Sequence, residues 1–475
     1  MVFNSLLFLV FFTLVSGAQY LPLSWTGRKL VLTLFSYLFY AAWYPPTIVI
    51  LWASTCLDWI VTRAMVRTES RSKRRSLLLA SLAFNLGVLG YFKYSGFVLD
   101  NLSPALAALG LHVPAGLIPH VLPVGISFYT FMSLAYVIDV YRGDTKPVGS
   151  LIDFALYLTF YPHLVAGPIV RSQDFLPQLE TPRRATTADF GWGLLLLLFG
   201  LFQKVVVADA LLAPIADRVF SGGASGNVVE SWAGALAFSG QIFCDFAGYS
   251  TCAVGAAACL GFRLPENFRR PYAALGFTDF WRRWHITLSS WLRDYLYISL
   301  GGNRAGKART LFNLMVTMLL GGLWHGAAWN FVIWGGLHGL FLCAERELKP
   351  LLTRLPAAWL AAMRPLGVAI TFVCVTFAWV FFRARTFHEA IGVVRGMIGL
   401  GRHGSTGALL HPLQVATAVV GVGTMLLIHQ RYRDSSLRQA LERKPSWVVA
   451  AAVACLIFVT VTTAGEDRAF IYFQF

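Results

Sequence analysis

The chain has 475 residues, of which 57% are hydrophobic and 13% are charged, whereas ordinary soluble domains have about 45–50% apolar and about 25% charged residues. This composition excludes a soluble enzyme and predicts an integral membrane protein. The net charge is +16, but the cations lie in short clusters between apolar runs. That pattern is typical of cytoplasmic loops, so no nucleic-acid partner is expected.

The first twenty residues form an apolar stretch that no Lys or Arg precedes. A secretory signal has a basic flank before its apolar core, so we interpret this stretch as a retained transmembrane helix. Arg28 and Lys29 follow it, which places the N-terminus outside the cell. Further apolar spans are expected at residues 30–44, 47–62, 76–94 and 118–139.

The loops between these spans differ in charge. The loop after residue 62 holds six cations up to Arg75, so it is expected in the cytoplasm, whereas residues 95–117 contain no Lys or Arg and are expected outside. Residues 150–185 are interrupted by Pro162, Gly167, Pro168 and Pro177. This stretch predicts re-entrant or buried irregular backbone instead of a simple span.

Long apolar spans follow in the second half of the chain. They are expected at residues 190–214, 232–261, 310–345, 366–382, 412–430 and 446–463. We therefore expect about ten to twelve crossings in an all-α polytopic fold. No hydrophilic stretch is long enough for a separate soluble domain, and no internal repeat is visible, so residues 1–475 are expected to form a single domain.

The seven cysteines lie inside apolar segments, and none forms a C-x-x-C pair. This favours buried hydrophobic cysteines over a zinc site or a disulfide framework. No metal site is expected. The G-x-S-x-G, H-E-x-x-H and P-loop motifs are also missing, so the sequence gives no support to a serine hydrolase, a zinc protease or a P-loop NTPase.

The segment from Asp279 to Tyr297 has bulky aromatic and aliphatic residues at helical spacing, with arginines largely on other faces. It predicts an amphipathic helix that lies along the membrane interface or dips into it. Such a helix can be a simple anchor. His285 lies beside Trp284, near the aromatic face, which keeps a functional role open.

A second feature is the apolar stretch from Leu319 to Gly339, which contains His325 flanked by glycine and alanine. An ionisable residue in such a stretch is costly and indicates function, and small neighbours allow close approach of another backbone or an acyl chain. The alternative is a histidine that joins helices by hydrogen bonds. His338 lies thirteen residues further, about 140° around an ideal helix. A metal pair between these two histidines on one unbroken helix is therefore not expected.

Taken together, four motifs resemble one enzyme family. They are LPVGISFYTFMSLAYVIDVYRG (Leu122 to Gly143), AGPIVRSQDFLPQL (Ala166 to Leu179), DFWRRWHITLSSWLRDYLYISLGGNR (Asp279 to Arg304) and GGLWHGAAWNFVIWGGLHG. Their order and spacing are similar to those of the membrane-bound O-acyltransferases, in the bacterial branch of alginate and exopolysaccharide O-acetyltransferases. The resemblance is weakest after residue 385. It implies a ring of transmembrane helices around a thin centre, where a cytoplasmic funnel meets an extracytoplasmic cavity.

The resemblance also implies the site residues. The family's W-H-G histidine falls on His325, which we expect to be the general base, because imidazole titrates near neutral pH. The second motif histidine falls on His285, which either orients the donor or acceptor or stabilises the oxyanion. His163 is a third candidate on a weaker motif match. Contacts to the donor phosphates are expected from Arg269, Arg270, Arg282 and Arg283, although positive-inside topology explains these arginines equally well.

The expected activity is transfer of an acetyl group from cytoplasmic acetyl-coenzyme A for O-acetylation of an extracytoplasmic polysaccharide such as alginate. The expected location is the bacterial inner membrane, with acetyl-coenzyme A as a substrate and no permanently bound cofactor. Exported acetyltransferase or acetyl-carrier proteins are the expected partners. A D-alanyl or longer-chain acyltransferase of a cell-envelope polymer is the alternative enzyme. A membrane transporter is the non-enzyme alternative, but its usual matching halves are not visible.

Overall fold

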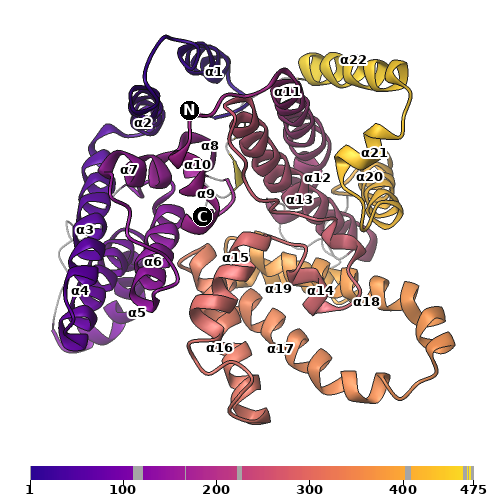
Figure 1. The fold of residues 1–475 in the computed structure, drawn as a ribbon. Helices are drawn as coiled ribbons and strands as arrows, with labels where there is room; N and C mark the ends of the chain where they lie inside the picture. The colour runs from indigo at the N-terminus through magenta and orange to yellow at the C-terminus, as the bar shows by residue number, and fades with distance from the viewer. Residues whose placement is uncertain are drawn as a thin grey trace. The chain divides into compact units, whose positions relative to one another are not determined.

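The computed structural model describes residues 2–110, 121–165, 167–221, 227–401, 408–463, 468, 470 and 471. All the regular elements in these ranges are helices, as Figure 1 shows. The chain divides into two compact units: unit 1 holds residues 1–197 and 250–265, and unit 2 holds residues 198–249 and 266–475. The single domain expected over residues 1–475 stays a prediction.

Unit 1 contains the N-terminal helices and a run of short ones. Its elements are α1 (Leu6–Ala18), α2 (Trp25–Ala41), η1 (Pro45–Thr47), α3 (Ile48–Arg67), α4 (Arg71–Leu89), η2 (Gly90–Tyr94), α5 (Ser95–Ala108), α6 (Ile126–Arg142), α7 (Leu151–Thr159), α8 (Tyr161–Leu164), α9 (Ser172–Phe175) and α10 (Pro177–Glu180). Helices α11 (Thr187–Leu201) and α13 (Val228–Cys259) contribute residues to both units.

Unit 2 contains the remaining helices. They are η4 (Phe202–Leu212), α12 (Ala213–Ser221), η5 (Pro271–Ala273), α14 (Phe277–Trp281), α15 (Ile286–Trp291), η6 (Leu292–Tyr297), α16 (Lys307–His325), α17 (Trp329–Leu352), α18 (Ala357–Arg383), α19 (Phe387–Met397), α20 (Pro412–Arg431), α21 (Leu437–Glu442) and α22 (Ser446–Thr463).

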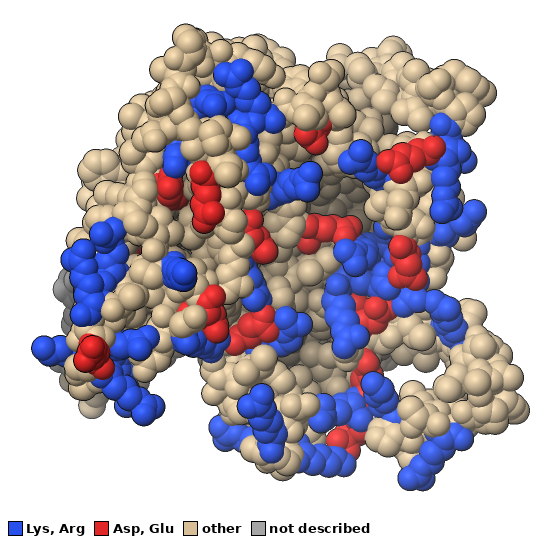
Figure 2. Space-filling view, viewed as in Figure 1, with Lys and Arg blue, Asp and Glu red and all other residues tan. Residues whose placement is uncertain are grey.

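Within the described ranges, seven helical stretches are long and apolar enough to cross a membrane. They are Pro45–Arg67, Arg71–Ala108, Thr187–Ser221, Val228–Cys259, Ala357–Arg383, Pro412–Arg431 and Ser446–Thr463. The prediction of an all-α polytopic membrane protein is thus confirmed. The ten to twelve crossings expected from the sequence also include shorter or more polar helices such as α2, α6, α16 and α17, and that total stays a prediction. Figure 2 shows Lys and Arg in clusters separated by broad areas without charge.

Serine residues begin several of these helices. The hydroxyls of Ser5, Ser24, Ser70 and Ser150 each accept a hydrogen bond from a backbone N–H in the first turn of α1, α2, α4 and α7. Such caps satisfy donors that have no partner inside the helix. The predicted irregular stretch 150–185 is indeed broken, because it divides into four short helices, and Pro162 and Pro177 lie in the first turns of two of them.

Two sequence predictions were wrong in their local structure. Residues 95–108 of the expected outer loop 95–117 form helix α5, which continues from α4 through one π-helical turn, η2. Residues 111–117 of that loop lie outside the described residues. The segment 279–297 is also not one amphipathic helix. It breaks between Trp281 and Ile286, where His285 adopts a left-handed backbone conformation with φ of 42°.

Helices α16 and α17 form a closely packed hairpin in unit 2, with a break at residues 326–328 inside the expected span 310–345. A Cβ atom on Gly322 would overlap the backbone of Phe331 and Gly335, and one on Gly335 would overlap the backbone of Met318. Small residues at these two positions therefore allow the helix backbones to approach. The break places His325 at the end of α16, facing the start of α17.

Candidate active site

His285 lies in the break between α14 and α15, and its position is fixed by Asn267. The side-chain oxygen of Asn267 accepts hydrogen bonds from the backbone N–H and the hydroxyl of Thr287, and it lies 3.2 Å from His285 Nδ1. These donors identify the amide oxygen, so Nδ1 carries the proton and Nε2 is the basic nitrogen. Burial lowers the pKa of His285 to about 3, so this imidazole is neutral at physiological pH.

The ring of His285 packs between elements that are distant in the sequence. Its centroid lies 4.7 Å from that of Phe246 in α13 and 6.0 Å from that of Trp324 in α16. Trp324 in turn contacts the ring of His325 at 4.9 Å. The two motif histidines therefore share one tryptophan neighbour, as expected if both belong to one site.

His325 is the last residue of α16 and is almost fully buried. The helix ends here because Gly326 has an extended conformation, with φ of −160°. The imidazole packs against Trp334 at 5.0 Å and Phe382 at 5.3 Å, in edge-to-face geometry. The next residue, Gly326, lines a large cavity. The imidazole of His325 thus packs in an aromatic layer, while the cavity begins at the next residue in the chain.

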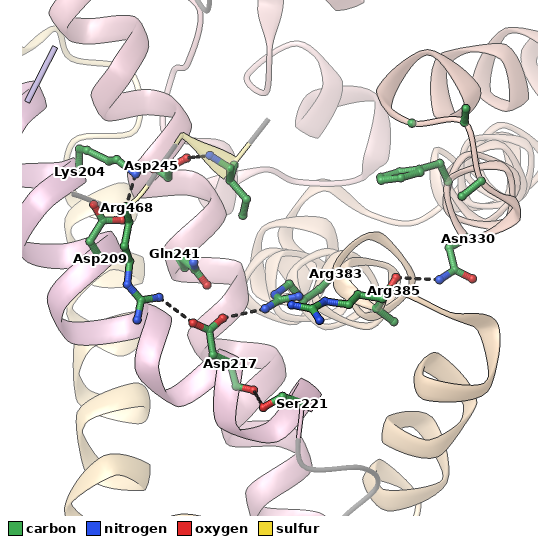
Figure 3. Close-up of a pocket in the computed structure, with 16 residues that line it drawn as sticks. Lys204, Asp209, Asp217, Ser221, Gln241, Asp245, Asn330, Arg383, Arg385 and Arg468 are labelled. Carbon is green, nitrogen blue, oxygen red and sulfur yellow. Dashed lines mark hydrogen bonds and ion pairs between the residues drawn. The ribbon is translucent and has the colours of Figure 1, made fainter. Parts of the chain in front are cut away.

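We name this space the lysine cavity; it has a volume of about 960 Å³ (Figure 3). Its lining includes four cations and three carboxylates: Lys204, Arg383, Arg385, Arg468, Asp209, Asp217 and Asp245. All of them belong to unit 2. A cavity with this lining can accept a hydrated, hydroxyl-bearing acceptor next to His325, because its walls offer charged and polar partners instead of an apolar surface.

Two ion-pair groups form the wall of the lysine cavity. Lys204 contacts Asp245, and its ammonium lies 3.0 Å from Asp209. Asp217 joins Arg383 at 2.7 Å and Arg468 at 2.6 Å, and both arginines point to it in Figure 3.

Near the chain's end, the N–H of Ile471 donates to Asp245 at 2.9 Å. The sequence interpretation missed Lys204, Asp209 and Asp245 as site residues. Their signal was charge inside the expected spans 190–214 and 232–261, where an ionisable residue indicates function.

Three of the four predicted donor-phosphate arginines line a second cavity in unit 2, which we name the arginine cavity. It has a volume of about 410 Å³ and is lined by Glu266, Arg269, Asp279, Arg282, Arg283, Asp434, Ser435, Ser436 and Gln439. Three of the four predicted arginines thus line one space, whereas Arg270, at the start of η5, is not part of its lining.

The charges of the arginine cavity are partly paired. Arg283 bonds Asp279 at 2.8 Å and Asp434 at 2.9 Å, and Arg433 adds a bond to Asp279 at 2.6 Å. Burial alone would raise the pKa of Asp279, but the N–H of Leu275 and these two arginines hold it below its usual value. Arg282 is exposed and has no ion pair among the described residues, so its charge is available to an anion.

His163, the third candidate, lies in unit 1 on the four-residue helix α8 and is fully buried. Its Nε2 lies 2.9 Å from the carbonyl oxygen of Tyr157, so Nε2–H donates to the backbone. The ring packs against Phe160 and Phe175, each at 5.5 Å. This geometry is that of a histidine held in a packed core, and a catalytic role for His163 stays a prediction.

Metal chemistry has no obvious ligand set in the part of the chain that the structure describes. No three side chains of His, Cys, Asp or Glu gather there in a group that could hold an ion.

Comparison with known proteins decides the family. The model of the MBOAT, or membrane-bound O-acyltransferase, family matches residues 146–385, which include all three candidate histidines and all four predicted arginines. The chain belongs to this family. It is therefore a multi-pass membrane enzyme that transfers acyl groups to oxygen.

Several named proteins align with most or all of this O-acyltransferase. A probable alginate O-acetylase of Pseudomonas putida is 40% identical over 499 aligned residues, covering 100% of both chains. One of Azotobacter vinelandii is 43% identical, covering 88% of this chain and 83% of its own. A peptidoglycan O-acetyltransferase of Helicobacter pylori is 31% identical, covering 100% of this chain and 98% of its own. The resemblance seen in the motifs is thus confirmed.

Proposed function

We propose that this O-acyltransferase takes an acetyl group from acetyl-coenzyme A on the cytoplasmic side and passes it to a hydroxyl on the outer side, for O-acetylation of a polysaccharide such as alginate. The carrying observation is the position of His325, which lies beside the lysine cavity and packs against the same aromatic layer as His285. The names of the full-length relatives, which act on alginate or peptidoglycan, support an envelope polysaccharide as the final acceptor.

In this proposal His325 is the general base. It removes the proton from an acceptor hydroxyl in the lysine cavity while the oxygen attacks the thioester carbonyl carbon. The tetrahedral intermediate then collapses, the C–S bond breaks, and the thiolate leaves and takes up a proton. An alcohol is a weak nucleophile at neutral pH, so a base of this kind is worth about 10²–10⁴-fold in rate.

The tautomer of His285 narrows the roles left open by the sequence. Its Nδ1–H is used by Asn267, so Nε2 carries a lone pair and no proton. A neutral nitrogen without a proton accepts a hydrogen bond but does not stabilise an oxyanion. We therefore assign His285 to orienting the donor or the acceptor by accepting a hydrogen bond from it.

The arginine cavity is the proposed site for the donor phosphates. Arg269, Arg282 and Arg283 line it, and phosphate binds best where several guanidinium groups converge. The segment from Arg269 to His285 thus carries both the phosphate contacts and one motif histidine. This arrangement supports a donor that enters from the arginine cavity and reaches toward the histidines.

Reconstitution tests the donor and the need for a partner. The purified protein in detergent is expected to bind or slowly hydrolyse acetyl-coenzyme A but to acetylate glycan poorly alone. An exported acetyltransferase or acetyl-carrier protein is expected to restore transfer, because no hydrophilic stretch of the sequence is long enough to form a domain that would hold a polymer. Efficient acetylation by the isolated chain would refute the partner requirement. Failure with every coenzyme A thioester would refute the donor, and use of D-alanyl thioesters in its place would favour the alternative enzyme.

Labelling in intact cells tests the proposed orientation, with the N-terminus outside and the protein in the inner membrane. Cysteines placed at Ser72 and Ser103 lie near opposite ends of the helical stretch Arg71–Ala108. Thirty-eight helical residues extend about 57 Å, more than the hydrocarbon core of about 30 Å. An impermeant reagent is expected to label the cysteine at 103 and not the one at 72. Equal labelling of both would overturn the proposed topology.

A further inference from the structure

His338 is a fully buried histidine of α17 that lies near the end of the fourth motif and has no part in the proposed mechanism. Aromatic rings surround it. Their centroids lie at 4.8 Å for Trp334, 5.1 Å for Trp281, 5.8 Å for Phe341, 5.9 Å for Phe280 and 6.4 Å for Trp379. Unit 2 thus holds one imidazole inside an aromatic box.

The polar atoms of this box are without partners. Among the described residues, neither ring nitrogen of His338 has a hydrogen-bond partner, and the same is true of the indole nitrogens of Trp281 and Trp334. A buried polar group without a partner costs about 1–3 kcal/mol, so native proteins rarely leave one. By contrast, His163 and His285 each pair one nitrogen with a protein oxygen. Four such atoms therefore lie close together in this box, and a ligand or ordered water that bonds them would remove this cost.

The box has neighbours on two sides, the arginines of the arginine cavity and His325. Trp281 immediately precedes Arg282 and Arg283, which line the arginine cavity. On the other side, Trp334 contacts both His338, at 4.8 Å, and His325, at 5.0 Å. In the proposed function, a donor whose phosphates bind the arginines passes its thioester arm along this box to reach His325.

We propose that His338, together with Trp281 and Trp334, forms a subsite for the amide-bearing arm of a pantetheine thioester. This inference rests on the proposed function, since it places the arm of the same donor. The hydrogen-bonding groups of the box match those of the pantetheine arm. A neutral imidazole has one N–H donor and one bare nitrogen, and a secondary amide has one C=O acceptor and one N–H donor. The two indole N–H groups match further carbonyl oxygens, and the ring faces match the methylene groups of the arm.

Trp281 is the side chain that admits the arm. It is half-buried, whereas Trp334 and His338 are fully buried, so Trp281 forms the solvent-side edge of the box. In this proposal Trp281 turns aside to open the box, and it lies on α14, outside the hairpin of α16 and α17. In this role His338 is a positioning residue: it holds the arm, while Trp334 lies between it and the reacting group at His325.

The test compares donors with and without amides. Acetyl-coenzyme A and S-acetyl-pantetheine carry the amides, and S-acetyl-propanethiol has none. His338→Phe keeps an aromatic ring and removes both nitrogens. It is expected to raise KM about tenfold for the two amide donors, equivalent to about 1.4 kcal/mol, with kcat little changed. The KM for S-acetyl-propanethiol is expected to stay the same. His338→Asn, which restores one donor and one acceptor, is expected to recover much of the loss.

A matched control is His429→Phe. His429 is another buried histidine of unit 2, but its ring lies against Phe243 and Tyr272 instead of along the route to His325. This variant is expected to leave all three KM values unchanged. If His338→Phe raises the KM for the amide-free donor by the same factor, the role of His338 is packing and the proposal is wrong. Unchanged KM values for all donors would show that the box holds only water, and would also overturn it.

A binding measurement separates this proposal from the proposed function. Pantetheine itself, which carries the amides but no acyl group, is expected to change the tryptophan fluorescence of the wild-type protein, because Trp281 and Trp334 line the subsite. The response is expected to weaken in His338→Phe or, if that variant does not fold, in Trp281→Phe. If pantetheine binds in this way but no thioester is consumed, the proposed function fails and the subsite stands. If thioesters are consumed and pantetheine causes no change, the subsite fails.

Discussion

The two cavities of unit 2 combine the same residue types but differ in burial. In the lysine cavity, the side chains of Lys204 and Asp245 are 4% and 2% exposed. In the arginine cavity, Arg269 is 56% exposed and Asp434 is 70% exposed. Exposed ion pairs contribute little to stability, whereas breaking a buried pair leaves a charge without water or partner. The comparison teaches that the buried pair of Lys204 and Asp245 holds the lysine cavity together, while the arginine cavity keeps one exposed cation, Arg282, that has no ion pair among the described residues.

The largest expected effect lies at the edge of the lysine cavity. His325→Ala is expected to reduce acyl transfer by about 10²–10⁴-fold, the usual worth of a general base, while the protein inserts and purifies normally. Transfer is measured with the donor and the exported partner together. His285→Ala is also expected to impair transfer, by a smaller factor. Near-normal transfer by His325→Ala would make this histidine structural and leave the lysine cavity without a catalytic group.

A stability measurement tests whether the buried charges hold the lysine cavity together. Lys204→Met leaves Asp245 and Asp209 without their cation, and is expected to lower stability by about 3–5 kcal/mol. Thermal unfolding in detergent measures the change. Adding Asp245→Asn removes the unpaired charge but keeps an acceptor for the N–H of Ile471, so the double variant is expected to recover part of the loss. A single variant as stable as the wild type would contradict the comparison.

A substitution in the arginine cavity is expected to weaken donor binding and to leave the stability of the protein unchanged. Arg282→Ala removes an exposed cation that has no ion pair among the described residues, and is expected to raise KM for acetyl-coenzyme A about tenfold, since hydrogen bonds to charged groups are worth about 1.5–3 kcal/mol. The melting temperature is expected to stay unchanged. Arg385→Ala, in the lysine cavity, is the control and is expected to leave the donor KM as it is. An equal rise of the donor KM in both variants would show that the two cavities do not differ in donor binding.

The smallest effect concerns pH. The arginines hold the pKa of Asp279 below its usual 3.8, so this carboxylate contributes stability above that pH and loses it as the pH falls through its folded value. Asp279→Asn is expected to lower the melting temperature slightly at pH 6, and the gap to the wild type is expected to close below pH 3.8. A gap that widens toward acid would show that the arginines do not stabilise this carboxylate.

Much of the fold could be predicted because membrane helices satisfy the hydrogen bonds of their own backbone and are visible in the sequence as long apolar stretches. The spans expected at 366–382, 412–430 and 446–463 correspond to α18, α20 and α22. The segment 279–297 could not be predicted in the same way. Its periodicity indicates a helix, but the contacts of Asn267 with His285 and Thr287 break it, and Asn267 lies outside the segment.

By itself, the sequence determined the class of the protein, its helical spans and three candidate histidines, because composition, apolar length and short motifs are local properties of the chain. It also selected four arginines, three of which line one cavity. Only the tertiary structure decided that Lys204 meets Asp245 and that Asp217 meets Arg383 and Arg468. It also decided that His338 lies between Trp281 and Trp334 with no hydrogen-bond partner among the described residues. The ion pairs join residues that are 41 to 251 positions apart in the sequence, and the position of His338 depends on how α14 packs on α17. Burial and charge pairing therefore follow from tertiary packing, which local sequence patterns do not contain.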